Sequence, residues 1–341
     1  MNLKKAAVLF MLTLFVAPVV VGSDAFASKT GSGISTGTGT VFLPNPVAEL
    51  QDQTLTDQKD ADFLALQPAY HPVVLTNLDG SGFLSGDWAI VRSSTGPLAF
   101  SSTNDFNYDR HDDRFEQVMA YYWITASQKY IQSLGFGSTL DSVNKLPQKV
   151  RLNQWGVDNS FADDKHDEIR LGKGGADDAE DAEVILHEYG HAIHFSQSPT
   201  FYASLESGAI GEGFADYWAV TVSSVISPTP DAPCVADWDS VSYTAATPHC
   251  LRRVDLDLHY PGDLNARVHH DGQIWSRALW DIRGALGHIK ADTIILQGQF
   301  GYPGTTMPDL AQRTVDAAQT LYGNAEANAV RGVFQSRGIL P

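Results

Sequence analysis

Apolar side chains recur at helical spacing along residues 113–134. Phe115, Val118 and Tyr122 stand three or four residues apart, so a helix would carry them on one face, and Gly135 follows the pattern as a stop signal. The sequence therefore predicts one long amphipathic helix, with its aromatic side chains in the core.

Shorter patterns surround this helix. Residues 41–102 contain β-branched and apolar runs such as VVLTNL and WAIVR between Gly and Pro turns, which is typical of strands. Two more strands are expected at residues 149–152 and 168–171. Residues 28–40 are mostly Gly, Ser and Thr without an apolar period, so we expect a flexible tail there.

The second half of the chain has a helical pattern. A helix is expected around the segment HEYGH at residues 187–191. Further helices are expected at residues 207–225, 272–286, 308–322 and 325–336. These patterns predict an α+β fold, with a β-rich N-terminal lobe over residues 41–180 and a helical C-terminal lobe over residues 181–341. HEYGH lies near the junction.

The first 27 residues have the pattern of a signal peptide. Lys4 and Lys5 precede an apolar run, and the small-residue site Ala25-Phe26-Ala27 follows it. The alternative is a membrane anchor, but the apolar run is short for a span and no second run follows. We expect a secreted protein without a membrane association once the signal is removed.

Charge and cysteine content narrow the choice of partners. The formal net charge is −17, which disfavours nucleic acid and agrees with plain solubility outside the cell. Cys234 and Cys250 are the two cysteines of the chain. In an oxidising compartment they are expected to form a disulfide, while a thiolate metal site is the alternative.

The segment HEYGH places two histidines four residues apart, hence one turn apart on the same helix face. His187 and His191 could share one zinc ion, with Glu188 beside them as the base that takes a proton from water. An ordinary helix with two histidines is the plain alternative.

A catalytic zinc site needs a third protein ligand and an open position. Glu212 is our choice, and Asp216, one turn later, could accept the free N–H of His187. His194 competes as a ligand because it lies on nearly the same helix face as His187, but the spacing of a zincin with a third histidine is not present. His269 or His270 could stabilise an oxyanion.

These segments, together with the long helix and the C-terminal TVDAAQTLYGNAEANAVRGVFQSRGI, resemble thermolysin-like gluzincin metallopeptidases, and more closely the fungalysin-type (M36-like) branch. The resemblance implies a zinc metalloendopeptidase. It implies zinc ligation by His187, His191 and Glu212, with Glu188 as general base and Asp216 orienting His187.

The resemblance also implies further roles. His269 would donate to the oxyanion with Tyr202 as its partner. Asn159 would bind the substrate backbone beside an exposed edge strand, taken as residues 168–171. Val184 would line the apolar pocket for the residue after the scissile bond, although simple helix packing explains this valine equally well. Protein or peptide substrates and a monomer are expected.

An acidic run, Asp177, Asp178, Glu180 and Asp181, precedes the HEYGH helix. Helix capping explains these charges, and a calcium site is the alternative. Strong calcium dependence is not expected. Two other functions stay open: a zinc-binding module without turnover, and an exopeptidase that captures a free terminus.

Overall fold

The computed structural model describes residues 35–153, 157–198 and 202–341, so the predicted signal peptide over residues 1–27 lies outside the described residues. The α-helices are α1 (Pro46–Leu50), α2 (Arg114–Ser133), α3 (Ala182–Gln197), α4 (Leu205–Ile226), α5 (Val268–Leu286), α6 (His288–Gln299), α7 (Met307–Tyr322) and α8 (Asn324–Ser336). Within the described residues, none of these helices has the length and hydrophobicity of a membrane span.

The strands form three small sheets. They are β1 (Ser35–Val41), β2 (His71–Leu78), β3 (Ala89–Ser93), β4 (Asp105–Phe106), β5 (Gln148–Leu152), β6 (Phe161–Asp163), β7 (Glu168–Arg170), β8 (Cys234–Val235) and β9 (Arg252–Arg253). One sheet has the order β2-β1-β4, the second β3-β5-β7-β6, and the third pairs β8 with β9. The mixture of helices and sheets confirms the predicted α+β class.

The predicted flexible tail is wrong for residues 35–40, which belong to β1. This strand pairs antiparallel with β2 and parallel with β4. Its glycines allow close packing: a Cβ at Gly37 would lie 2.4 Å from the Asn104 carbonyl oxygen, and one at Gly39 would lie 2.7 Å from a Val118 methyl. Gly37 and Gly39, which suggest flexibility in the sequence, are therefore required by the close neighbours of a central strand.

The predicted edge strand is also wrong. Residues 168–170 form β7, but β7 lies between β5 and β6, so the edge strands of this sheet are β3 and β6, and β6 is the one next to β7. The two strands are joined by a short turn at residues 164–167 and pair antiparallel. Sequence pattern located a strand, but the order of strands in a sheet depends on pairing that the pattern does not contain.

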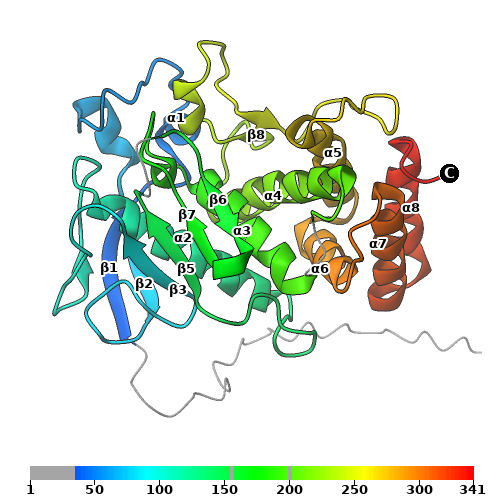
Figure 1. Cartoon of the computed structure of the whole chain (residues 1–341), viewed down its shortest axis with the longest axis horizontal. Coiled ribbons are helices and arrows are strands. Elements are labelled where there is room, and N and C mark those ends of the chain that lie inside the picture. Colours follow the sequence, from blue (N-terminus) through cyan, green and yellow to red (C-terminus); the bar gives the residue numbers. More distant parts are fainter. Residues whose placement is uncertain (1–34, 154–156, 199–201) are drawn as a thin grey trace, which may run out of the picture. The chain divides into compact units, whose positions relative to one another are not determined.

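The long predicted helix is confirmed as α2, and it packs against both the strands and α3 (Figure 1). Phe115, Val118 and Trp123 are fully buried in the main core. The aromatic side chains of this helix are thus core residues, as the helical period indicated.

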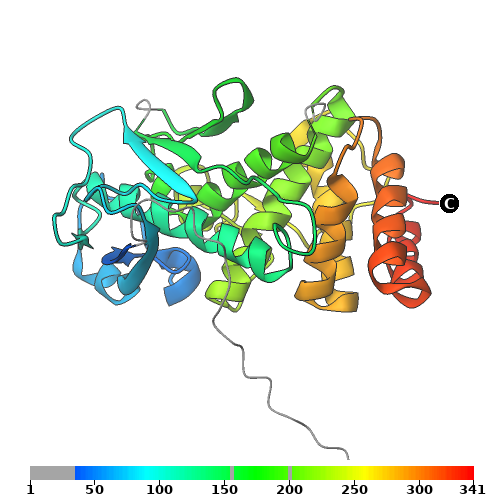
Figure 2. The ribbon, with the colours of Figure 1, turned by 90° about the horizontal axis from the view of Figure 1, so that it is seen from below.

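The four helices α4, α5, α7 and α8 confirm the helices predicted in the second half, while α6 was missed. Gly287, with a φ of 77°, separates α5 from α6 by a single residue. The apolar residues Ile294, Ile295 and Leu296 are consecutive, so the sequence of α6 does not show the three- or four-residue apolar spacing by which a helix is predicted. Figure 2 shows α6, α7 and α8 side by side at the C-terminal end, in agreement with their mutual contacts.

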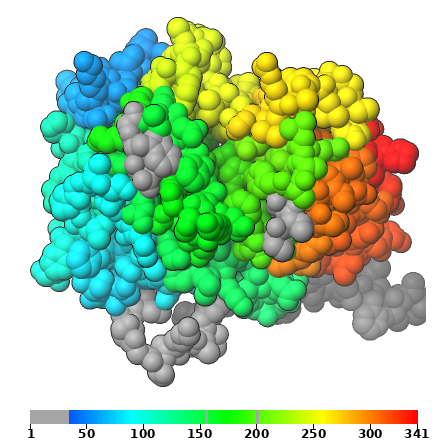
Figure 3. All heavy atoms as spheres, in the orientation of Figure 1, coloured from blue at the N-terminus to red at the C-terminus, as the bar shows by residue number. Residues whose placement is uncertain are grey.

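The disulfide predicted between Cys234 and Cys250 is present, and both ends lie near the β8–β9 pair. In the space-filling view of Figure 3, the green residues that include α3 and α4 separate the cyan strands from the orange C-terminal helices. Helix α3 contacts both the long helix α2 and the C-terminal helix α4.

The acidic run before α3 has several structural roles. Asp181 is the N-cap, and its side chain accepts a 2.9 Å hydrogen bond from the Glu183 backbone N–H. Glu180 is fully buried and pairs with Arg110 at 2.8 Å. Capping thus explains one of the four acidic residues, and burial of Glu180 is compensated by a buried cation.

Candidate metal centre and active site

Helix α3 brings His187 and His191 together. The two imidazole rings stand one turn apart, and their Nε2 atoms are 3.1 Å from each other. Both side chains are largely buried, and the helix α3 that carries them packs against α4. The four-residue spacing read in the sequence therefore produces two nitrogen atoms aimed at one point.

Helix α4 supplies Glu212 at the same point. Its Oε2 lies 3.3 Å from His187 Nε2, and its Oε1 lies 3.7 Å from His191 Nε2. The helices approach closely at Gly190, where an added Cβ would stand 2.8 Å from the Ala215 Cα. The glycine inside HEYGH thus lets the carboxylate reach both histidines.

The spacing of these three groups fits a zinc ion. Zinc bonds of about 2.0–2.2 Å to nitrogen and oxygen in a tetrahedral site place neighbouring donor atoms about 3.3–3.5 Å apart. The observed separations are 3.1, 3.3 and 3.7 Å. Glu212 Oε2 is also a buried oxygen without a hydrogen-bond partner among the described residues. Ligand atoms of His187, Glu188 and His191 all lie within 4.8 Å of one another.

Asp216 supports His187 from behind. Its Oδ1 lies 2.8 Å from His187 Nδ1, so the other ring nitrogen faces Glu212. Arg252 holds the same carboxylate with two hydrogen bonds of 2.6 and 2.7 Å. Burial alone would raise the pKa of Asp216, but Arg252 and His187 lower it to about 2. The imidazole is therefore oriented by an anion that stays ionised.

Arg252 was not identified from the sequence. It lies in β9, within the segment LRRVDL, which has no helical or metal-ligand spacing. The one available signal was the requirement that a buried Asp216 have a cationic partner, and this requirement does not say which arginine of the chain supplies it.

Glu188 points into the same region from the next position of α3. Its side chain is buried, and its Oε2 has no hydrogen-bond partner among the residues described. Burial raises the pKa of Glu188 to about 7. A carboxylate with a pKa near neutrality suits a group that must both accept and return a proton.

His269, at the start of α5, reaches the centre, whereas His270 does not. His269 Nε2 lies 3.3 Å from Glu212 Oε2, and His270 Nδ1 instead lies 3.2 Å from Asp271 Oδ1. The His269 side chain is 61% exposed, so it stands at the open side of the centre. Burial lowers the pKa of His269, which favours the neutral ring.

Tyr202 lies beside His191 rather than His269. Its hydroxyl is hydrogen-bonded to His191 Nδ1, and within the described residues no hydrogen bond joins it to His269. The rings of Tyr202 and His191 meet edge to face with centroids 5.6 Å apart. The role of Tyr202 beside His269 at the oxyanion stays a prediction, while the contact that this structure shows for the hydroxyl is with His191 of α3.

His194, the competing ligand, is directed elsewhere. Its ring stacks on Phe214 with centroids 4.2 Å apart. It is fully buried, and burial holds the pKa of the imidazole well below its ordinary value. A neutral histidine packed on an aromatic ring is a core residue. This agrees with the sequence analysis, in which the spacing made His194 a weaker candidate for a metal ligand than Glu212.

Asn159 and Val184 both line a pocket beside His187 and Glu188. Asn159 lies two residues before Phe161, where the edge strand β6 begins, and its backbone is also close to Gly172, just after β7. The two residues are therefore adjacent to the candidate centre, although the strand assigned to this role changes.

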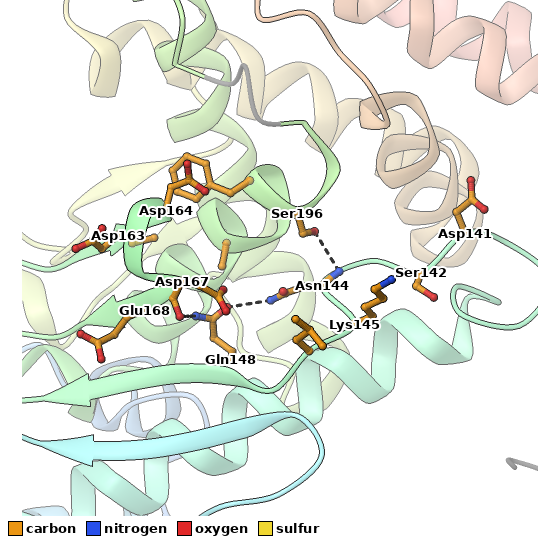
Figure 4. A pocket seen from close by; sticks show the side chains of 14 residues that line it. Asp141, Ser142, Asn144, Lys145, Gln148, Asp163, Asp164, Asp167, Glu168 and Ser196 are labelled. Atoms are coloured by element: carbon orange, nitrogen blue, oxygen red, sulfur yellow. Dashed lines mark hydrogen bonds between the residues drawn. The ribbon is translucent and has the colours of Figure 1, made fainter. Parts of the chain in front are cut away.

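A larger cavity, not lined by His187, Glu188 or Glu212, lies along the C-terminal half of α3 (Figure 4). Its lining comes from the segment 141–148, from residues 162–168 of the β6–β7 hairpin and from α3. Asn144 donates a 3.0 Å hydrogen bond to Gln148, and its backbone N–H donates to Ser196. None of the metal-binding groups found in the described residues lines this cavity, so size alone does not mark the active site.

The fold is similar to that of a known metalloproteinase. The chain shares its fold with the precursor of protealysin, a metalloproteinase from Serratia proteamaculans, with a TM-score of 0.52 and 17% identity over 77% of this chain and 91% of that one. This similarity concerns the fold alone.

The sequence comparisons narrow the class to one family. Residues 172–292 match the family model of fungalysin metallopeptidases (M36). The chain is 23% identical to the extracellular metalloproteinase MEP of Pyricularia oryzae over 201 residues, and 27% identical to extracellular metalloproteinase 2 of Phaeosphaeria nodorum over 115 residues. These regions cover 48% and 30% of this chain, and 31% and 17% of the relatives. The findings support a fungalysin-type metallopeptidase and confirm the resemblance.

Proposed function

We propose that this chain is a secreted, zinc-dependent metalloendopeptidase that hydrolyses peptide bonds of extended polypeptides. The observation that carries the proposal is the spacing of His187, His191 and Glu212, whose donor atoms stand 3.1–3.7 Å apart, as neighbouring ligands of one tetrahedral ion would. A metallopeptidase family match over residues 172–292 supports it.

Each polar group of the centre has a role in this reaction. Zinc held by the three ligands would supply a Lewis acid and make water a stronger nucleophile at neutral pH. Glu188 accepts the proton of the attacking water and returns it to the leaving amine. His269 donates a hydrogen bond to the oxyanion from the open side. Tyr202 orients His191, and Asp216 orients His187.

The position of the substrate follows from the strand next to the centre. Strand β6 is the edge of its sheet, and an extended peptide can pair with such an edge through backbone hydrogen bonds. Asn159 precedes this strand and lines the pocket that also contains Glu188. A peptide along β6 would pass the centre between a β-rich N-terminal lobe and a helical C-terminal lobe, with α3 at their junction.

Two relatives of this chain are named extracellular metalloproteinases, which supports secretion and protein or peptide substrates. The disulfide between Cys234 and Cys250 agrees with an oxidising compartment. We propose that the enzyme acts as a monomer.

The general-base role is tested by Glu188→Gln. The variant should bind zinc with the parent stoichiometry, yet its kcat on unfolded casein should fall by about 10²–10⁴-fold. Equal turnover by the variant would exclude Glu188 as the base. If neither protein cleaves casein while both bind zinc, the chain is a binding module; cleavage of free dipeptides but not of end-blocked peptides would identify an exopeptidase.

The oxyanion role is tested by a matched pair of variants. His269→Ala should lower kcat by about 10²-fold or more, because one donor to the oxyanion is lost. His270→Ala removes the neighbouring ring, which faces Asp271, and should leave kcat within about threefold of the parent. Equal losses in both variants would argue against a specific role for His269.

A further inference from the structure

The pocket beside the candidate centre is acidic at one end. It contains about 100 Å³ of space and is lined by His187 and Glu188 together with Asp178 and Asp239. Asp178 lies in the turn before α3, and Asp239 follows β8, so separate segments of the chain bring the two carboxylates together. Both side chains are 3% exposed.

These carboxylates lack complete hydrogen bonding. Asp178 Oδ1 and Asp239 Oδ1 are buried and have no hydrogen-bond partner among the described residues. Oxygen atoms of Asp158, Asp178 and Asp239 all lie within 4.8 Å of one another. The ordered partners are neutral hydroxyls: Ser160 donates to Asp178, and Tyr243 donates to Asp158 at 2.6 Å. A buried oxygen without a hydrogen-bond partner costs free energy, so these oxygens indicate that the pocket binds a ligand which supplies the missing partner.

No resident cation satisfies them. In the described part of the chain, no Lys, Arg or His nitrogen forms an ion pair within 4.0 Å of Asp158, Asp178 or Asp239. Arg252 lines the pocket, but its guanidinium is held by Asp216 through two hydrogen bonds. Burial raises the pKa of Asp178 to about 7, and burial together with Asp178 raises that of Asp239, as expected for acids without a neighbouring counter-charge.

Part of the pocket wall is apolar. Val184, Val235, Ala236 and Leu251 line the same pocket as the acids. A lysine or arginine side chain has a matching structure, because a methylene stem can lie along apolar surface while the charged head reaches polar groups beyond it. A hydrated metal ion alone would make no use of these walls. The combination favours a basic side chain over an isolated cation.

We propose that this pocket binds a lysine or arginine side chain of the peptide substrate, next to the scissile bond, with Asp178 and Asp239 as the residues that determine this specificity. The inference rests on the proposed endopeptidase function and deepens it. It replaces a purely apolar pocket at Val184 with one that is partly apolar and also contains two acids. Asp158 adds a third carboxylate within 4.8 Å of these two.

The test compares end-blocked peptides that differ at one position, which is Lys, Leu or Glu, with cleavage sites determined by mass spectrometry. The zinc-loaded parent enzyme should cleave next to Lys with a kcat/KM at least about tenfold above that for Leu, and hardly at all next to Glu. Asp239→Asn and Asp178→Asn keep the side-chain shape, and each should reduce the Lys value by about tenfold while changing the Leu value less than about threefold.

Asp141→Asn is the matched control, because Asp141 is an exposed acid in the other cavity and belongs to a segment other than the β6–β7 hairpin, so its replacement should leave the Lys-to-Leu ratio unchanged. Zinc content and the urea midpoint of each variant establish that it is folded. Cleavage of all peptides with a preference for Leu would overturn the proposal and leave the endopeptidase function intact. Absence of cleavage of any peptide or of casein would overturn the function itself.

A calcium site is the rival occupant. Calorimetric titration of the zinc-loaded enzyme with Ca²⁺ separates the two. Saturable binding that disappears in Asp239→Asn, together with an unchanged Lys-to-Leu ratio in that variant, would show that the three acids hold an ion, and the side-chain proposal would be wrong.

Discussion

The substitution Asp216→Asn separates two functions of one buried carboxylate. Asp216 lies 2.8 Å from His187 Nδ1 and accepts two hydrogen bonds from Arg252. An asparagine keeps the shape but removes the negative charge. The variant should therefore bind zinc less tightly and should also be less stable when it contains no metal.

The two losses have different sizes. Removing the carboxylate behind a metal-binding histidine lowers metal affinity by about 10–100-fold, or about 1.4–2.8 kcal/mol. Leaving a buried cation without its anion costs about 3–5 kcal/mol of folding free energy. The Arg252 side chain is 14% exposed, so a value near 3 kcal/mol is expected. The double variant Asp216→Asn with Arg252→Met should recover most of the stability but not the zinc affinity.

Zinc affinity is measured by competition with a chelator of known dissociation constant, and stability by urea unfolding of the zinc-free protein. The expected result is a weaker zinc affinity in both variants and a low urea midpoint in the single variant alone. If Asp216→Asn binds zinc within about threefold of the parent, the carboxylate does not tune the metal site and the reasoning from the His187 contact fails.

Three further predictions concern stability. Glu180→Gln should lower the free energy of unfolding by about 1.5–3 kcal/mol in urea titrations, because Arg110 loses its fully buried partner at 2.8 Å but keeps Asp57; a change below about 0.5 kcal/mol would contradict this. Burial and the nearby acids raise the pKa of Asp237 from 3.8 to about 9. The stabilising contribution of protonated Asp237 is thus fully present below about pH 4 and is lost as the pH rises through 9. The urea midpoint of the parent should therefore fall between pH 6 and pH 9, and the urea midpoint of Asp237→Asn should fall less. Replacing Cys234 and Cys250 by Ser should cost about 3 kcal/mol, since the disulfide closes a short loop, and an unchanged urea midpoint would refute it.

Local pattern predicted the parts of the centre that lie on single helices. The four-residue spacing of His187 and His191 is fixed by the geometry of α3, and the apolar residues around Glu212 predicted the helix α4 that carries it. These predictions needed no knowledge of the rest of the chain, because a helix determines which of its own residues share a face.

Pairing between distant segments could not be predicted in this way. Arg252 meets Asp216 across 36 positions of the sequence, and β6 becomes an edge only through the order in which strands pair. The acidic end of the pocket has the same origin. Asp178 belongs to a run that capping seemed to explain, and Asp239 belongs to a loop without a motif, so their proximity is a property of the tertiary structure.

The geometry of the centre depends on residues that contribute no side chain to it. At Gly190, a Cβ would lie 2.8 Å from the Ala215 Cα, and at Gly213 it would lie 2.2 Å from the Gly272 carbonyl oxygen. These contacts set the distance of α4 from α3 on one side and from α5 on the other. Because the candidate ligands His187 and Glu212 lie on α3 and α4, a displacement of about 1 Å between these helices would separate their donor atoms beyond the reach of one ion, and a similar shift of α5 would move His269 away from Glu212. The glycine of HEYGH is thus as necessary to the site as its histidines, since it determines whether Glu212 can approach them.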